Sequence, residues 1–114
     1  MMRAESTDPD TARFDAVRRY LTENFPEADI PAPTDFGGVA RGRVFSIEDW
    51  DNSTHQLELE RAVYEDRSVA QVVNLLDSYE VASTLQANPD MRLVITATLA
   101  GGVQCHVDEL RQWS

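Results

Sequence analysis

The sequence of 114 residues predicts an α+β fold. We expect a mainly antiparallel sheet of about four strands, built from two hairpins, with two or three helices packed on one face, in the order α-β-β-α(α)-β-β. Three observations predict it: an apolar stripe at helical spacing near the N-terminus, a strand with period-two alternation near the middle, and two β-branched runs joined by Gly-Gly in the last third. The sequence shows no internal repeat or low-complexity tract, so residues 1–114 are expected to form a single domain.

The first helix is predicted to begin at Asp8-Pro9, because aspartate caps helix N-termini and proline suits the first helical position. Its apolar residues recur at spacings of three, four and four, which places them on one helical face. These residues are Phe14, Val17, Leu21 and Phe25. Pro26 ends the helix, and the polar residues 1–8 are expected to be disordered.

Residues 26–38 are predicted to be an extended connector, because they hold three prolines and two glycines. Two arrangements of this segment are open. Either it packs along the sheet with Ile30 and Phe36 as anchors, or it leaves the first helix free to move. We expect packing, since long unpacked connections are uncommon in a compact domain.

The first hairpin is predicted from residues 39–47 and 55–63, with a polar turn at residues 48–54. In the second strand, Leu57, Leu59 and Arg61 alternate with Gln56, Glu58, Glu60 and Ala62. This alternation predicts one face against a core and one face in water. If the register and the faces match, Arg41 or Arg43 lies opposite Glu58 or Glu60.

Helical structure is predicted after Tyr64, with Asp66 or Ser68 as its cap. The buried stripe of this segment is Val69, Val72, Val73 and Leu76. A break at residues 77–78 either starts a second short helix capped by Ser78 or bends one helix that runs on to Gln86. The part after the break buries Val81, Ala82 and Leu85. Residues 88–90 form a turn before the next strand.

The last hairpin is predicted from residues 92–99 and 103–107, joined by a two-residue turn in which Gly101 and Gly102 adopt positive φ angles. The face expected to pack on the core carries Leu93, Ile95, Ala97 and Leu99. Cys105 shares a face with Val103 and Val107 and is expected to be buried. Residues 108–114 are expected to form a helical turn in which Leu110 and Trp113 fold back.

Charge is the most unusual property of the chain, because twenty acidic residues against ten arginines and no lysine give a net charge of −10. The acids are spread along the sequence without an acidic tail, which predicts a distributed negative coat. Direct binding to nucleic acid or to an anionic membrane is disfavoured, since such partners need a basic surface. A basic protein partner is permitted. Solubility or adaptation to high salt is the alternative explanation.

The single cysteine excludes an intramolecular disulfide and a multi-cysteine metal site. No apolar run approaches the roughly 20 residues that a membrane span needs. The N-terminal residues are polar and lack the apolar region of a signal peptide. A cytoplasmic location is therefore the expectation.

No group of residues is typical of catalysis or cofactor binding. Cys105 and His106 are adjacent, so in a strand they point to opposite faces and cannot act together as nucleophile and base. His55 follows Asp49 and Asp51 closely enough for a cation cluster, but a polar turn explains the same residues and the calcium-loop template fails. We expect no metal ion, no cofactor and no catalytic residue, which favours a protein that is not an enzyme.

Trp50 stands between Asp49 and Asp51 at a turn that should be exposed. Either it folds over the end of the sheet as a lid on the core, or the three residues form an acidic contact surface with a central aromatic side chain. On the second interpretation, the chain is a small acidic, non-catalytic interaction or regulatory protein that binds a basic protein. Glu58 and Glu60 are the further candidate contact residues. A narrower form is an inhibitor that mimics nucleic acid, of the anti-defence or immunity type.

Two other function classes are open. A small ligand-binding domain or enzyme subunit would use a pocket between the helices and the sheet. A homodimer would join through a sheet edge or through the first helix. The sequence carries no signature that is specific to either class.

Overall fold

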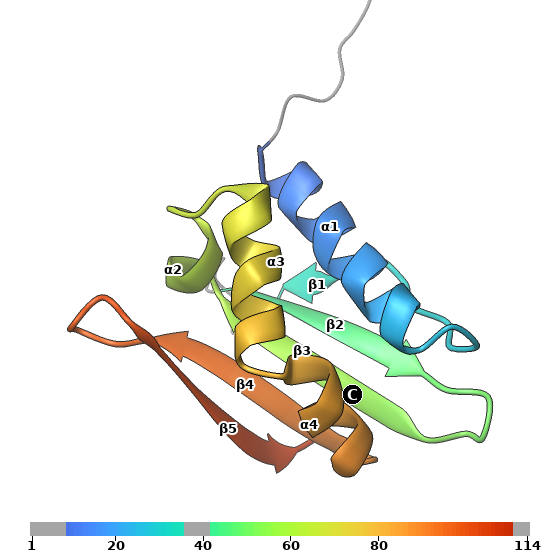
Figure 1. The fold of residues 1–114 in the computed structure, drawn as a ribbon. Coiled ribbons are helices and arrows are strands. Elements are labelled where there is room, and N and C mark those ends of the chain that lie inside the picture. The colour runs from blue at the N-terminus through green and yellow to red at the C-terminus, as the bar shows by residue number, and fades with distance from the viewer. Residues whose placement is uncertain (1–8, 36–41, 111–114) are drawn as a thin grey trace, which may run out of the picture.

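In the computed structural model, the described residues are 9–35 and 42–110 (Figure 1). The elements in chain order are α1 (Pro9–Asn24), β1 (Thr34–Asp35), β2 (Gly42–Glu48), β3 (Thr54–Glu60), α2 (Arg61–Tyr64), α3 (Val69–Ser78), α4 (Val81–Ala87), β4 (Met91–Ala97) and β5 (Val103–Glu109). This order contains the predicted elements, with a short strand β1 added in the connector and a short helix α2 added after β3. The predicted cap at Asp8, the disorder of residues 1–8, the anchor at Phe36 and the pairing of Arg41 lie outside the described residues.

The sheet has five strands in the order β1-β2-β3-β4-β5, and the helices lie on one side of it (Figure 1). Both predicted hairpins are present, as the antiparallel pairs β2–β3 and β4–β5. Strands β3 and β4 are parallel, because the helices between them carry the chain back to the end of the sheet where β3 starts. The α+β fold with a mainly antiparallel sheet and helices on one face is confirmed, and the sheet is mixed.

The connector packs on the sheet, as expected. Ile30 is buried in the core, and the backbones of Asp29 and Glu48 exchange two hydrogen bonds of 2.9 Å. The guanidinium of Arg18 donates to the Ile30 carbonyl from Nε (3.1 Å) and Nη2 (2.8 Å), which ties α1 to the connector. Val17 and Leu21 of the predicted helical stripe are fully buried.

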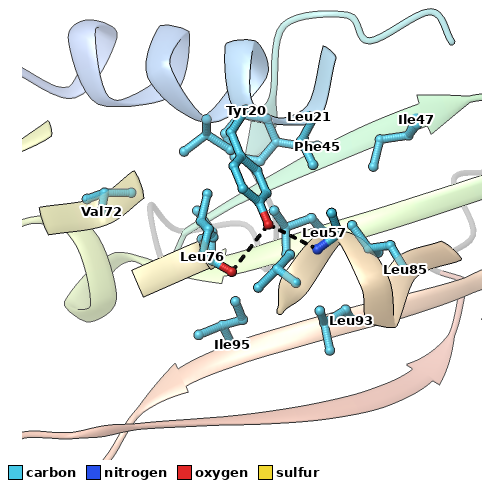
Figure 2. Close-up of a cluster of buried hydrophobic side chains, with 14 of the residues drawn as sticks. Tyr20, Leu21, Phe45, Ile47, Leu57, Val72, Leu76, Leu85, Leu93 and Ile95 are labelled. Carbon is cyan, nitrogen blue, oxygen red and sulfur yellow. Dashed lines mark hydrogen bonds between the residues drawn. The ribbon is translucent and has the colours of Figure 1, made fainter. Parts of the chain in front are cut away.

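The core lies between the helices and the sheet (Figure 2). Its largest contributions from the strands are Phe45, Ile47, Leu57, Leu59, Leu93 and Ile95, and the helices add Leu21, Val72, Leu76 and Leu85. These strand residues alternate along their strands, as a sheet with one face on a core requires.

A buried hydroxyl from α1 joins the ends of two other helices (Figure 2). Tyr20 Oη donates to the Leu76 carbonyl (3.3 Å) and accepts a hydrogen bond from the Ala82 amide (3.2 Å). A carbonyl in the last turn of α3 and an amide in the first turn of α4 have no partner within their own helices. One side chain therefore caps both helices at the corner where they meet.

The structure of the corner between α3 and α4 differs from the prediction in the residue that caps the second helix. There are two helices, but Ser78 is the last residue of α3 and does not cap α4. Glu80 takes the capping position with a φ of +52°, and its side chain makes no capping hydrogen bond. At the start of α3, Ser68 is the cap, and it forms a reciprocal capping box with Gln71.

The outer face of the first hairpin is less exposed than predicted. Gln56 and Glu58 are 4% and 5% exposed, and the Arg92 side chain from β4 donates to the Glu58 carboxylate on this face. The second strand also ends at Glu60, where α2 begins. The register places Arg43 opposite Leu59 on the core side, over the ring of Phe14, so its predicted pairing with Glu58 or Glu60 across the hairpin is wrong.

The second hairpin is closed by a longer turn than predicted. Residues 98–102 form it, with the Thr98 amide donating to the Gly102 carbonyl (2.9 Å), and only Gly101 has a positive φ. Leu99 is fully exposed at the tip of this turn and is not a core residue. Asp108 and Glu109 continue β5 and do not start a helix.

The prediction that Cys105 is buried is wrong. It shares the core-facing side of the sheet with Val103 and Val107, but Val103 and Val107 are only partly covered and Cys105 is exposed. A side chain can be buried on a sheet face only where another layer covers that face.

Replacing Tyr20 with phenylalanine should lower the free energy of unfolding by about 1–3 kcal/mol, because two buried backbone groups lose their partner. Urea denaturation measures the loss. Tyr79→Phe is the matched control, since Tyr79 is 46% exposed, and it should change stability by less than about 0.5 kcal/mol. Equal effects of the two substitutions would show that the Tyr20 hydroxyl does not hold the corner.

The same hydroxyl predicts a pH dependence. Burial raises the pKa of Tyr20 above its ordinary value of 10.0, with a smaller contribution from Asp77. The stabilisation from the neutral hydroxyl is therefore fully present below pH 10.0 and is lost as the pH rises through the higher pKa of the folded state. The difference in unfolding free energy between the wild type and Tyr20→Phe should be constant near neutral pH and should shrink in strongly alkaline buffer.

Candidate functional site

The turn between β2 and β3 is built by its own aspartates. The Asp49 carboxylate accepts a hydrogen bond from the Trp50 amide (2.8 Å), and the Asp51 carboxylate accepts from the amide (3.0 Å) and the hydroxyl of Ser53. These Ser53 contacts, the hydroxyl first, lower the pKa of Asp51 below its ordinary value. Asn52 adopts a φ of +71°, which asparagine tolerates in turns.

Trp50 projects from this turn and is 73% exposed. The interpretation of Trp50 as a lid on the core is therefore wrong, and the interpretation of Asp49, Trp50 and Asp51 as a contact surface stays a prediction. His55 is 3% exposed and lies on the core side, with its ring 5.1 Å from that of Phe25. Within the described ranges, no group of three or more histidine, cysteine, aspartate or glutamate residues could hold a metal ion.

Further carboxylates meet at this end of the sheet. Asp29 lies beside Glu48 through the backbone bridge described above. On the other side, Thr54 pairs with Glu48 and exchanges hydrogen bonds with Asp90, whose amide donates to the Thr54 carbonyl (2.8 Å) and whose carboxylate accepts from the Thr54 amide (3.0 Å). Glu27 lines a hollow together with Asp49 and Trp50. We refer to Glu27, Asp29, Glu48, Asp49, Asp51 and Asp90, with Trp50, as the acidic end.

The hollow beside Trp50 has a volume of about 230 Å³. Its walls come from the end of α1, the β2–β3 turn and α4, and its lining residues are Asn24, Phe25, Pro26, Glu27, Asp49, Trp50 and Gln86. The Gln86 side chain donates to the Asn24 carbonyl (3.0 Å), which joins α4 to α1 at this site. The hollow combines an aromatic face with two carboxylates, a set that suits a cationic side chain.

The arginines do not neutralise the acidic end. Among the residues that the structure describes, none of its carboxylates forms an ion pair. Arg13, Arg18 and Arg67 donate to backbone carbonyls within the chain. Arg61 pairs with Glu65, and Arg92 pairs with Glu58 and Asp108. At the acidic end, therefore, no arginine of the described residues compensates the negative charge.

Glu58 and Glu60, the other predicted contact residues, lie away from this end. Glu58 is buried on the outer face of the sheet, where its carboxylate is 2.5 Å from Nη1 of Arg92. The Glu60 carboxylate accepts a hydrogen bond from the Ala97 amide (2.8 Å) at the far end of β3. Both carboxylates serve contacts within the chain, and the structure does not bring them to Trp50.

Sequence reasoning missed Glu27, Asp29 and Asp90, which come from two separate connections. Asp90 could have been placed at the acidic end if β3 and β4 had been predicted to be parallel. Parallel pairing brings the starts of both strands to the same end of the sheet. For Asp29, the signal would have been the bridge to Glu48, which no local pattern predicts.

Comparisons with protein-family models, with curated proteins and with solved structures found no match to this chain. In the described part of the chain, no helix has both the length and the apolar character needed to cross a membrane. The functional argument therefore depends on the site alone.

Replacing Arg92 with methionine should lower the free energy of unfolding by about 1.5–3 kcal/mol, because the buried Glu58 carboxylate loses a charged hydrogen-bond donor. Arg61→Met is the control: its pair with Glu65 is half exposed, and its loss should cost only a few tenths of a kcal/mol. Urea denaturation of both variants measures the difference. A small loss for Arg92→Met would mean that this ion pair does not stabilise the outer face.

Glu48→Gln should stabilise the free chain by a few tenths of a kcal/mol at low salt, because like charges directly opposite each other in a ladder repel. Asp29→Asn should act in the same direction. Asp15→Asn is the control, since Asp15 is exposed on α1, four residues before Arg19, and its removal should not stabilise. Thermal unfolding at low salt compares the variants, and destabilisation by Glu48→Gln would contradict repulsion at the bridge.

Proposed function

We propose that this chain is a small acidic protein that acts without catalysis, by binding a basic protein partner through the acidic end. The observation that carries the proposal is the 73% exposure of Trp50 among carboxylates that have no ion-pair partner in the described residues. An exposed tryptophan costs solubility, and tryptophan is enriched at binding hot spots. The proposed setting is the cytoplasm.

The surface has the chemistry to recognise arginine or lysine side chains. A guanidinium or ammonium group stacks on an indole face, and nearby carboxylates strengthen the contact. The hollow of about 230 Å³ gives one such side chain a place between Trp50, Glu27 and Asp49. The remaining carboxylates raise the encounter rate with a positively charged protein by long-range attraction.

Nucleic-acid mimicry is the narrower form of this proposal. Asp29, Glu48 and Asp90 lie in a line across neighbouring strand ends, with Thr54 between Glu48 and Asp90. Adjacent strands are about 4.8 Å apart, so the line would present three carboxylates in a row, with one strand position between the second and the third. A partner bound in this way would release its own DNA or RNA in exchange for the chain.

The proposal is tested with a fluorescein-labelled nona-arginine peptide and fluorescence anisotropy. Trp50→Ala should weaken binding about tenfold, which corresponds to roughly 1.4 kcal/mol. The double substitution Asp49→Asn with Asp51→Asn should have a similar effect, because both amides keep the turn's hydrogen-bond acceptors while removing charge. Binding should weaken steeply as NaCl is raised.

A charge-matched control separates a site from a general coat. Glu65→Gln with Asp66→Asn removes the same charge near the far end of β3, next to the start of α3, and should change the affinity less than twofold. If both double variants weaken binding by the same factor, the peptide responds to the net charge of the protein alone and the acidic end is not a specific site. If Trp50→Ala binds like the wild type, the aromatic side chain is not a contact.

The second candidate function is a ligand-binding domain. One observation, a groove beside α3, supports it. Two adjoining hollows of about 310 and 380 Å³ lie between α3 and the β4–β5 turn and share Arg67, Gln71 and Gly102. Neither hollow is lined by a histidine or a cysteine, and the Arg67 guanidinium donates to the Val63 carbonyl. The groove therefore offers fewer groups for recognition than the acidic end.

A further inference from the structure

The two edges of the sheet differ in a way that bears on assembly. The β1 edge is two residues long and follows two prolines, Pro31 and Pro33, which discourage pairing with another strand. The β5 edge is seven residues long and pairs with β4 residue by residue without a bulge. It contains no proline or glycine, and its only formal charges are at its last two positions. Among residues 9–35 and 42–110, therefore, the β1 edge is short and follows prolines, whereas no strand pairs with the outer side of β5.

The register shows which backbone groups of β5 point outward. The Thr98 amide donates to the Gly102 carbonyl, and hydrogen-bonded and non-bonded pairs alternate along an antiparallel ladder. Gln104 and His106 therefore bond to β4. Val103, Cys105 and Val107 direct their N–H and C=O groups away from β4, toward the open edge.

The side chains of these outward-bonding residues lie on the helix side of the sheet, at the margin of the helix layer (Figure 1), where α3 and α4 reach Val103 and Val107 only in part. Cys105 is exposed, and Val107 is 38% exposed. Tyr79, at the end of α3, is 46% exposed and lines the same hollow as Val103. An apolar strip therefore runs beside the free backbone edge.

Charge selects a second copy of the chain as the occupant. Two acidic proteins repel each other least where their surfaces are neutral, and the five residues 103–107 of β5 carry no formal charge. In an antiparallel pair of two β5 strands, Asp108 and Glu109 of each strand lie past the first residue of the other strand. In a parallel pair, these acids would face each other and repel.

We propose that β5 pairs antiparallel with β5 of a second copy, with Cys105 facing its counterpart at the two-fold axis. This register places Val103 opposite Val107 on the helix side and Gln104 opposite His106 on the outer side. It matches apolar with apolar and polar with polar side chains at every central position, and Asp108 lies beyond the ladder, opposite Gly102. A shift by two residues in one direction would oppose Val103 to Glu109, and a shift in the other direction would oppose Val107 to Gly101.

Light scattering coupled to size exclusion tests the assembly. We expect a mass near twice the 12.8 kDa of the chain, falling toward 12.8 kDa on dilution. A short bismaleimide should link two copies, and because Cys105 is the only cysteine of the sequence, the link identifies the contact. Residues directly opposite each other have Cα atoms about 5.5 Å apart, within reach of such a reagent.

Two variants distinguish this interface from any other. Cys105→Pro removes an outward N–H that β4 does not use, so the monomer should keep its circular dichroism spectrum while the dimer is lost. Val107→Lys should also give the monomer and should abolish the cross-link, by placing a charge in the apolar strip. Thr22→Lys adds the same charge on the exposed side of α1 and should leave the dimer intact.

A wild-type mass of 12.8 kDa at all concentrations would overturn the proposal. So would a dimer that persists in Val107→Lys, because it would use another face. If Cys105→Pro does not fold, Val107→Lys and the cross-link still decide. A monomer that captures a strand from another protein at β5 would also refute self-association.

Discussion

The corner between α3 and α4 depends on a hydroxyl that belongs to neither helix. Tyr20 reaches it from α1 and satisfies one backbone group of each. Through this corner the chain returns across the sheet and enters β4 parallel to β3. The return brings Asp90 beside Thr54, and thereby completes the acidic end. A buried contact in the middle of the core thus determines which charges meet on the surface.

The fold class was predictable because its signals are local. The apolar stripe of α1 and the alternation around Leu57 and Leu59 each depend on a few neighbouring residues. The parallel pairing of β3 and β4 was not predictable in the same way, since it depends on the direction in which three short helices carry the chain. The burial of Cys105 was predicted from alternation alone. Alternation shows which face a residue takes but not whether a helix reaches that strand.

In the candidate site, too, the features that depend on neighbouring residues were predictable, and those that depend on distant contacts were not. Asp49, Trp50 and Asp51 are contiguous, so a polar turn with a central tryptophan was visible in the sequence. Glu58 looked equivalent to any other acid in an alternating strand, and only the position of Arg92 across the sheet shows that its carboxylate is occupied. In the described residues the carboxylates of the acidic end have no ion-pair partner because the arginines make their contacts elsewhere, and the sequence gives the number of arginines but not their partners.

The bridge between Asp29 and Glu48 has a consequence for how electrolyte acts on this protein. Mobile cations gather around the two facing carboxylates and lower their repulsion, so added salt stabilises the folded chain on its own. If the chain binds a basic partner as proposed, the same cations would compete with that partner for those carboxylates. Ionic strength would then change the stability of the free protein and the lifetime of such a complex in opposite directions.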